Sequence, residues 1–295
     1  MSRPDGGPTR RVRAPAKLTL TLRVTGRRPD GYHDLDALAV SLSDPADDLE
    51  ITPGAGPSRL EVTGILDGVP TTGDNLVVAA ARLAGVSCHI RLHKRIPAGA
   101  GLGGGSADAA AVLRALGFRD PSLAARLGSD VPFCLHGGPA RLRGRGEVLE
   151  PVTLPALPPV VVVHPGFPLA TPSVYRAWDD LGGPAGTPVP APAALAASGG
   201  ELVNDLEPAA WHLAPRLADL ARSLPRPGPA RYLLAGSGSC LWAFATDRDV
   251  AAGTAAEVSA EAGLRCWVGE VLGAGGPGAA AGLSDPAGDA ASASA

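Results

Sequence analysis

Apolar and polar residues alternate from Lys17 to Thr25, with leucine or valine at every second position. A period of two residues is typical of a strand that buries one face. The same alternation recurs at Leu38, Val40 and Leu42, and again at 88–92, and predicts further strands. The residues at 27–31 read as a turn between the first two strands, because they contain Pro and Gly in an Arg-Arg-Pro-Asp-Gly run.

Helical patterns appear between these strands and in the second half of the chain. The residues at 75–83 predict a helix with Asp74 or Asn75 as its N-cap. The second half predicts strands at 160–163, 231–234, 240–244 and 266–271, and helices at 173–180, 207–220 and 249–262. Mixed elements of this kind are typical of an α+β sandwich.

A proline-rich stretch, Pro151 to Pro159, separates the two halves. Because such linkers carry few crossing contacts, we expect an N-terminal domain at 8–153 and a C-terminal domain at 158–271. The segment at 182–200 and the tail at 272–295 consist mainly of Gly, Pro, Ala and Ser. They are predicted to lack ordered structure, since they offer too little apolar surface to offset the entropy of ordering.

Composition narrows the classes of function. The chain has 295 residues, of which 45% are hydrophobic, and a formal net charge of -3. That charge gives no general attraction to nucleic acid or to anionic membranes, so neither is an expected partner. We find no apolar run long enough for a spanning helix and no apolar segment behind the N-terminal arginines, which predicts a cytoplasmic protein.

The spacing of the cysteines and histidines predicts neither a metal site nor a redox site. The four cysteines are widely separated and form no C-x-x-C pair, so we expect reduced, structural thiols. Five histidines show no metal-ligand spacing and are expected to be structural or solvated: His89, His93, His136, His164 and His212. Lys17 and Lys94 are the only lysines among 26 basic residues, which singles out both of them.

The strongest chemical signal is a glycine-rich segment between a strand and a helix-forming run. It reads Lys-Arg-Ile-Pro-Ala-Gly-Ala-Gly-Leu-Gly-Gly-Gly-Ser-Ala-Asp from Lys94 to Asp108. Glycines let backbone N–H groups turn toward an anion, and the start of the following helix adds about half a positive charge. The segment is therefore predicted to hold phosphates, with Ser106 as a helix cap or as a hydroxyl ligand to phosphate or magnesium.

Two other phosphate-binding classes fit this segment less well. Gly99, Gly101 and Gly104 match the G-x-G-x-x-G pattern of dehydrogenases, but the following Asp120-Pro121 reads as a turn or helix start rather than a strand-end acid. A Walker A loop requires a Gly-Lys-Ser/Thr sequence that is missing here. The alternative without a function is that this segment is a flexible surface loop.

Three further segments supply the other parts of a phosphoryl-transfer site. Lys17 is placed at the start of a strand, Asp130 precedes an extended run kinked by proline, and the residues at 234–240 form a second glycine-rich turn between strands. An acid can orient or deprotonate an attacking hydroxyl, and a lysine can offset charge on the transferred group.

These segments resemble the three motifs of the GHMP kinase superfamily. The Arg-Pro-Asp-Gly-Tyr-His turn at 28–33 narrows the resemblance to its diphosphocytidyl-methylerythritol kinase family, and the motifs occur in the family's order over nearly the whole chain up to residue 271. The resemblance implies two domains, one similar to domain 2 of ribosomal protein S5 and one ferredoxin-like. It also implies ATP and Mg²⁺ as cofactors and a monomer or weak homodimer that acts on a small molecule.

The implied reaction is ATP-dependent phosphorylation of the 2-hydroxyl of a cytidine diphosphate-linked methylerythritol, a step in isoprenoid precursor synthesis. The resemblance implies Lys17 and Asp130 as the catalytic pair. It implies an ATP loop made of Pro97, Gly99, Gly101, Leu102, Gly103, Gly104, Gly105 and Ser106. It implies a substrate site made of Thr19, Tyr32, His33, Thr171, Tyr175, Gly236, Ser237, Gly238 and Ser239, with Tyr32 and Tyr175 on opposite faces of the cytosine.

One departure from the family concerns Thr19, where the family usually has asparagine, so the polyol contact at this position differs. The alternatives are another GHMP kinase of the homoserine or mevalonate type, or a catalytically silent nucleotide-binding relative. The Arg-Pro-Asp-Gly-Tyr-His turn argues against the first, and retention of both Lys17 and Asp130 argues against the second.

Overall fold

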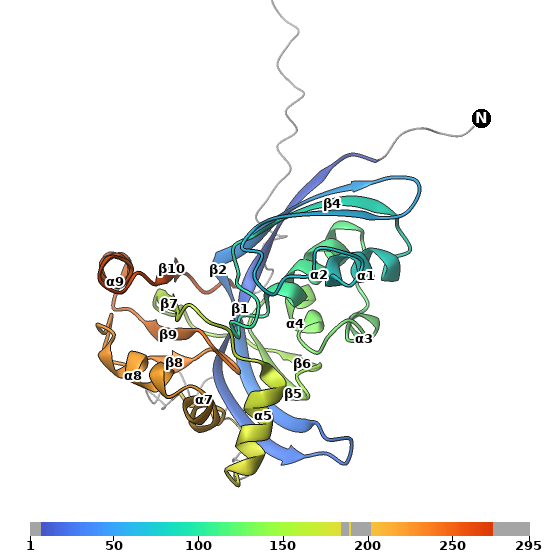
Figure 1. Ribbon diagram of the computed structural model, residues 1–295. Helices are drawn as coiled ribbons and strands as arrows, with labels where there is room; N and C mark the ends of the chain where they lie inside the picture. The colour runs from blue at the N-terminus through green and yellow to red at the C-terminus, as the bar shows by residue number, and fades with distance from the viewer. Residues whose placement is uncertain (1–6, 184–188, 190–201, 274–295) are drawn as a thin grey trace, which may run out of the picture.

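The computed structural model describes residues 7–183, 189 and 202–273, which form two sheets with helices packed on them (Figure 1). The first sheet contains β1 (Arg10–Arg27), β2 (His33–Pro53), β3 (Arg59–Gly64), β4 (Cys88–Lys94), β5 (Ala140–Gly144) and β6 (Val148–Pro151). The second contains β7 (Val160–His164), β8 (Leu233–Leu234), β9 (Leu241–Phe244) and β10 (Arg265–Gly269). The helices are α1 (Leu76–Leu83), α2 (Gly104–Ala115), α3 (Pro121–Ala124), α4 (Val131–His136), α5 (Thr171–Asp180), α7 (Glu207–Leu213), α8 (Pro215–Ser223) and α9 (Arg248–Ala262).

The first sheet is built on the long antiparallel hairpin of β1 and β2. Its strand order is β3-β4-β2-β5-β6, with β1 paired to β2 outside this path and β3 parallel to β4. Helices α1, α2 and α4 lie together on one side of this sheet (Figure 1). Buried side chains of α2, such as Val112 and Leu113, belong to the same core as Ile90 and Leu92 of β4, so the core fixes where α2 begins.

The second sheet has the order β10-β7-β9-β8, and all its described pairs are antiparallel. It is joined to the first sheet through the β1–β2 hairpin. Leu42 of β2 bridges to Val271, and Leu22 of β1 bridges to Asn204. The hairpin therefore carries residues of the first sheet to the edge of the second.

The predicted N-cap of α1 is confirmed, whereas the helix predicted at 207–220 is divided into two. The side chain of Asn75 caps α1 by accepting from the Val77 N–H. The sequence predicts a single helix at 207–220, but α7 and α8 are separate, because Ala214 has φ -138° and ψ 77°. The cause is Pro215, since the residue before a proline is disfavoured in the helical region.

The structure corrects the local setting of both catalytic candidates. Lys17 lies inside β1, not at its start, because the preceding residues Arg10 to Pro15 also pair with β2. A register shift between Pro15 and Lys17 marks a bulge, a feature that re-aims neighbouring side chains. Asp130 precedes a helix, α4, and not an extended run. Pro132 is tolerated there because the first turn of a helix has no internal acceptors for its N–H groups.

The segment predicted to lack structure at 182–200 has at least one ordered position. Val189 is 4% exposed. Its N–H donates to Asp36 and its carbonyl accepts from Arg141, which itself binds Asp36 with two hydrogen bonds. Hydrogen bonds from its backbone to the Asp36–Arg141 ion pair therefore fix Val189 in place. The composition of the segment did not predict this. Positions 184–188 and 190–201 and most of the predicted tail lie outside the described residues.

None of the helices in the described part of the chain combines the length and the apolar character that crossing a bilayer requires.

Candidate active site

A cavity of about 1110 Å³ lies between the glycine-rich segment, the turn end of the β1–β2 hairpin and α5. It gathers residues that are far apart in the sequence. Of the predicted site residues, those that line it are Lys17, Thr19, Tyr32, His33, Pro97, Gly99, Gly101, Leu102, Gly103, Gly104, Gly105, Ser106, Asp130, Thr171, Tyr175, Gly236 and Ser237. Gly238 and Ser239 are not among its lining residues.

The loop at 97–104 is held to the rest of the protein by its carbonyl groups. The carbonyl of Gly99 accepts from the N–H groups of Leu169 and Ser239, that of Ala100 from Cys240, and that of Leu102 from Lys17. In the described residues, none of the N–H groups from Gly99 to Ser106 donates to a backbone carbonyl outside its own helix. The anchored loop therefore retains its donors, which is the arrangement an anion requires.

Glycine is required at several loop positions by conformation and by space. Gly99, Gly101 and Gly103 have positive φ values of 65°, 76° and 65°. A Cβ atom on Gly101 would lie 1.9 Å from the Ala235 carbonyl oxygen, so no side chain fits there. Gly103 is the N-cap residue of α2, so of the two roles expected for Ser106 the capping role is wrong and the role as a hydroxyl ligand stays a prediction. Ser106 lies in the first turn and lines the cavity.

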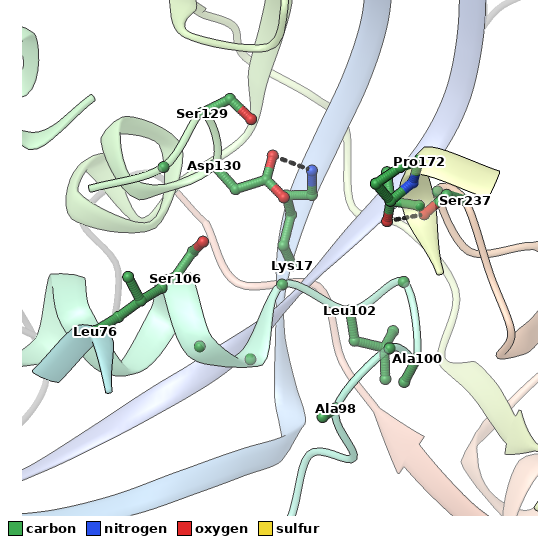
Figure 2. Close-up of a pocket in the computed structure, with 18 of the residues that line it drawn as sticks. Lys17, Leu76, Ala98, Ala100, Leu102, Ser106, Ser129, Asp130, Pro172 and Ser237 are labelled. Carbon is green, nitrogen blue, oxygen red and sulfur yellow. Dashed lines mark hydrogen bonds and ion pairs between the residues drawn. The ribbon is translucent and has the colours of Figure 1, made fainter. Parts of the chain in front are cut away.

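Lys17 and Asp130 form an ion pair beside this loop (Figure 2). The Nζ atom of Lys17 lies 2.5 Å from Oδ1 of Asp130, and the two side chains are 10% and 30% exposed. A Cβ atom on Gly103 would lie 3.3 Å from the Lys17 Cβ and 3.7 Å from Oδ2 of Asp130. The acid, the lysine and the start of α2 thus meet at one point of the cavity wall.

The other lysine, Lys94, lies in a buried acidic cluster under the loop. It donates to Asp47 and, at 2.7 Å, to Asp108, and all three side chains are at most 4% exposed. Asp47 also accepts from the N–H groups of Arg95 and Ile96 at the end of β4. The cluster therefore ties β2, the strand before the loop and the helix after it to one another.

Burial disfavours the charged forms of both Asp108 and Lys94, but the neighbouring charges lead to different outcomes for the two groups. Burial raises the pKa of Asp108, and the negative charge of Asp47 adds to the effect, although Lys94 opposes it. Burial also disfavours the charged form of Lys94, but the two carboxylates outweigh it and raise the pKa of the ammonium group. Oδ1 of Asp108 has no hydrogen-bond partner among the described residues.

The opposite end of the cavity is aromatic. Tyr32 is 55% exposed, and the guanidinium of Arg145 lies 4.7 Å from the centre of its ring. The ring of Tyr175 stacks on His33 with centroids 4.9 Å apart. Burial, with a contribution from the charge of Asp130, raises the pKa of Tyr175, so its phenol is neutral in the folded protein at neutral pH.

The first residues of the second glycine-rich turn, Gly236 and Ser237, line the cavity, and the later residue Ser239 holds the turn in place. Ser237 lines the cavity (Figure 2). Its hydroxyl shares a hydrogen bond of 2.7 Å with that of Thr171. The hydroxyl of Ser239 donates to the Phe167 carbonyl, and the residue is completely buried. Ser239 therefore fixes the turn from behind, away from the cavity.

Several cavity residues were not predicted from the sequence. Those among them with a charged side chain include Arg27, Asp108, Arg126, Arg145, Arg176 and Asp179. An arginine-rich chain gives no signal that separates these arginines from solvated ones. Asp108 lies four positions after the start of α2, and this placement was the available hint, since side chains of a helix lean back toward its N-terminus and thus toward the loop.

The comparisons with known proteins agree on one family. Residues 75–138 match the family described as GHMP kinases N terminal domain. The 4-diphosphocytidyl-2-C-methyl-D-erythritol kinase of Paracoccus denitrificans is 46% identical over 257 residues, which cover 83% of this chain and 91% of that protein. A crystal structure of 4-(cytidine 5'-diphospho)-2C-methyl-D-erythritol kinase superposes with a TM-score of 0.73 at 39% identity, covering 90% of this chain and all of that one.

More distant structures share the fold. Homoserine kinase from Cytophaga hutchinsonii has a TM-score of 0.64 at 18% identity and covers 92% of this chain. The predicted α+β GHMP kinase fold is confirmed, and the homoserine-type and mevalonate-type alternatives are not favoured. The chain therefore belongs to the 4-diphosphocytidyl-2-C-methyl-D-erythritol kinase family, whose members are small-molecule kinases that use ATP.

Proposed function

We propose that the protein transfers the γ-phosphoryl group of ATP to the 2-hydroxyl of 4-diphosphocytidyl-2-C-methyl-D-erythritol. The observation that carries this proposal is the meeting of the Lys17–Asp130 ion pair with the anchored glycine loop in one cavity. Phosphoryl transfer depends mainly on positioning and on charge stabilisation, and this arrangement supplies both.

In the proposed site, the free N–H groups of the loop and the start of α2 hold the phosphates of ATP. Asp130 orients the attacking hydroxyl and accepts its proton as the new bond to phosphorus forms and the bond from the γ-phosphorus to the bridging oxygen breaks, with ADP as the leaving group. Lys17 donates to Oδ1 of Asp130 at 2.5 Å, so its charge lies where negative charge accumulates on the transferred group. Because Oδ1 is engaged by Lys17, Oδ2 of Asp130 is the oxygen proposed to face the hydroxyl.

Magnesium is proposed to enter with ATP. In the described residues, no group of three or more His, Cys, Asp or Glu side chains is placed to hold a metal ion by itself. This donor set fits Mg²⁺, which usually keeps several waters and binds through substrate phosphates with one or two protein oxygens. Ser106 offers a hydroxyl oxygen on the cavity wall that would hold it, and the ion would neutralise phosphate charge.

The aromatic end of the cavity is proposed to bind cytidine. Tyr32 and Tyr175 are to stack on the base, His33 to contact its edge, and Thr19, Thr171, Gly236 and Ser237 to approach the polyol and diphosphate. Gly238 and Ser239 act in this proposal through the backbone turn that they hold. The Thr19 hydroxyl lies 3.8 Å from a Cβ atom built on Gly236, which puts it between the first strand and the second glycine-rich turn.

Two further predictions concern organisation. We propose that residues 8–153 and 158–271 are the two domains, because the first sheet ends at Pro151 and the second begins at Val160. A cytoplasmic location and a monomeric or weakly dimeric state stay predictions.

A coupled assay of ADP release tests the proposed function. Purified protein with ATP and Mg²⁺ is given the cytidine diphosphate-linked methylerythritol, homoserine or mevalonate in parallel. We expect turnover with the cytidine compound alone, and phosphorus NMR of the product should show a new phosphate monoester. Faster turnover of homoserine or mevalonate would overturn the assignment.

A further inference from the structure

The side chain of Asn204 holds the second glycine-rich turn from outside the cavity. Its amide nitrogen donates to the carbonyls of Leu234 at 2.9 Å and Gly236 at 2.7 Å, and its Oδ1 atom accepts from the Leu206 N–H at 3.0 Å. Asn204 is 7% exposed and is not among the residues that line the cavity. Two acceptors on one side and a donor on the other fit a single orientation of the amide, so every one of these contacts is used.

The backbone around Asn204 is fixed to the first sheet. Asn204 bridges to Leu22 of β1, and the carbonyl of Leu22 accepts from the Asp205 N–H at 3.0 Å. The carboxylate of Asp205 accepts from the Val24 N–H at 2.9 Å and pairs with Arg23. Asn204 therefore reaches the turn after β8 from a segment that β1 holds in place.

The hydrogen bond to the Gly236 carbonyl decides where the N–H group of Ser237 points. Both groups belong to one peptide unit, which is planar and is not among the cis bonds of the described residues, so they point in opposite directions. The carbonyl points to Asn204, outside the cavity. The N–H group therefore points to the other side of the turn, where Gly236 and Ser237 line the cavity.

The other carbonyl that Asn204 binds follows the same rule. The Leu234 carbonyl accepts from Asn204, and the N–H of Ala235, on the same peptide unit, donates to the Cys240 carbonyl at 2.9 Å. The Ser237 N–H, in contrast, donates to no acceptor among the described residues. A backbone donor that the protein leaves free in a cavity wall is suited to an anion.

The turn packs directly against the glycine loop that is proposed to hold ATP. A Cβ atom on Gly236 would lie 3.2 Å from the Gly101 carbonyl oxygen, and one on Gly101 would lie 2.9 Å from the backbone nitrogen of Gly238. Both compounds of the proposed reaction carry phosphate groups, ATP in its triphosphate and the cytidine substrate in its diphosphate. The anion suited to the free N–H is therefore a phosphate oxygen of one of these two compounds.

We propose that Asn204 is a positioning residue for phosphate binding. By holding the Gly236 carbonyl outside the cavity, it directs the Ser237 N–H into the cavity, where this group donates to a phosphate oxygen. Asn204 acts through the turn and touches neither compound. This inference rests on the proposed function and adds to it a residue that does not line the cavity.

The test separates the contribution of the phosphates from that of the rest of each ligand. Dissociation constants of cytidine, CDP, adenosine and a non-hydrolysable ATP analogue with Mg²⁺ are measured by NMR titration of the full-length protein. The ratio of the nucleoside constant to the nucleotide constant reports the gain from phosphate. In Asn204→Ala we expect this ratio to fall by about tenfold, equivalent to ~1.4 kcal/mol, for at least one of the two pairs. The constants for cytidine and adenosine should change by less than about twofold.

The pair whose ratio falls identifies the phosphate. A lower ratio for CDP assigns the Ser237 N–H to the diphosphate of the cytidine substrate, and a lower ratio for the ATP analogue assigns it to the triphosphate. Asn204→Asp is a second variant if Asn204→Ala folds poorly. It keeps the size of the side chain and the acceptor for Leu206 but places an oxygen where the two donors were, so it should lower the same ratio.

Asp205→Ala is the matched control. It loosens the same segment from Val24 and Arg23 without touching the turn, so the melting temperature should fall while both ratios stay within about twofold of wild type. Wild-type ratios in both Asn204 variants would overturn the inference, even with a lower melting temperature, because Asn204 would then be purely structural. An equal loss in Asp205→Ala would also overturn it. Wild-type protein that binds neither nucleotide would instead overturn the proposed function.

Discussion

Replacing Gly103 with alanine tests whether the glycine loop is an ATP site held in one conformation. Gly103 has a φ of 65°, and a Cβ atom there would lie 3.3 Å from the Cβ atom of Lys17. The left-handed conformation costs a residue with a side chain about 1–2 kcal/mol. Lys17 lies within a paired strand, so we expect the loop to move and Lys17 to stay.

The movement should appear in the affinity for ATP. Relieving the strain rotates the peptide groups on either side of Gly103, and their N–H groups are among those proposed to hold phosphate. A loss of 1–2 kcal/mol corresponds to a factor of about 5–30, so the Michaelis constant for ATP and the dissociation constant of a non-hydrolysable analogue should rise by that factor. The Michaelis constant for the cytidine substrate should change by less than about twofold.

Gly105→Ala is a control for stability within the same segment. Gly105 is not among the glycines with positive φ, and its Cβ atom would meet the Leu76 side chain at an ordinary 3.6 Å. Gly105 lies in α2, where alanine is favoured over glycine by about 1 kcal/mol. The melting temperature of the Gly105→Ala protein should therefore not fall below that of wild type. ATP affinity of Gly103→Ala within about twofold of wild type, in a folded protein, would refute the reasoning.

Four further predictions address the reacting pair, the base site and the buried charges. Lys17→Ala and Asp130→Ala should each lower kcat by a few hundredfold, equivalent to ~3–4 kcal/mol, with little change in circular dichroism, and kcat within about threefold of wild type would contradict the mechanism. Tyr32→Ala and Tyr175→Ala should each raise the Michaelis constant for the cytidine substrate by about five- to hundredfold, whereas phenylalanine at either position should nearly restore it. Because the pKa of Tyr175 is raised, the unfolded state ionises first above about pH 10 and stability falls as pH rises, so Tyr175→Phe should have a shallower alkaline loss of stability in urea titrations than wild type. Lys94→Met should lower the free energy of unfolding by about 3–5 kcal/mol in urea titrations at neutral pH, because it leaves two buried carboxylates without their cation, and a loss below about 1 kcal/mol would show that the cluster contributes little.

Local patterns predicted the parts of the fold that local chemistry decides. The cap at Asn75 and the strands with alternating leucines follow from side chains within a few residues of one another. The loop at 97–104 was predicted as a phosphate site because dense glycine between a strand and a helix is typical of anion-binding loops. The placement of Lys17 beside Asp130, 113 positions apart, came from the family resemblance, since nothing in either neighbourhood specifies the other.

The missed features depend on partners that are distant in the sequence. Val189 looks like part of a featureless segment until Asp36 and Arg141 are placed beside it. Asp179 resembles any exposed acid at the end of a helix, and only the fold brings it against His33. Local sequence patterns miss such contacts because the energy lies in a tertiary hydrogen bond and not in the propensity of the segment.

The way the glycine loop is anchored limits how far the two halves of the chain can be treated as separate units. Gly99 and Ala100 belong to the N-terminal half, yet their carbonyls accept from Leu169, Ser239 and Cys240 of the C-terminal half. A fragment that ended before β7 would leave these carbonyls to water and lose the template that shapes the loop. Consider a chimera that joins the first half of this chain to the second half of another family member. Every residue of the loop would come from this chain, yet the affinity for nucleotide would depend on which protein supplied the second half.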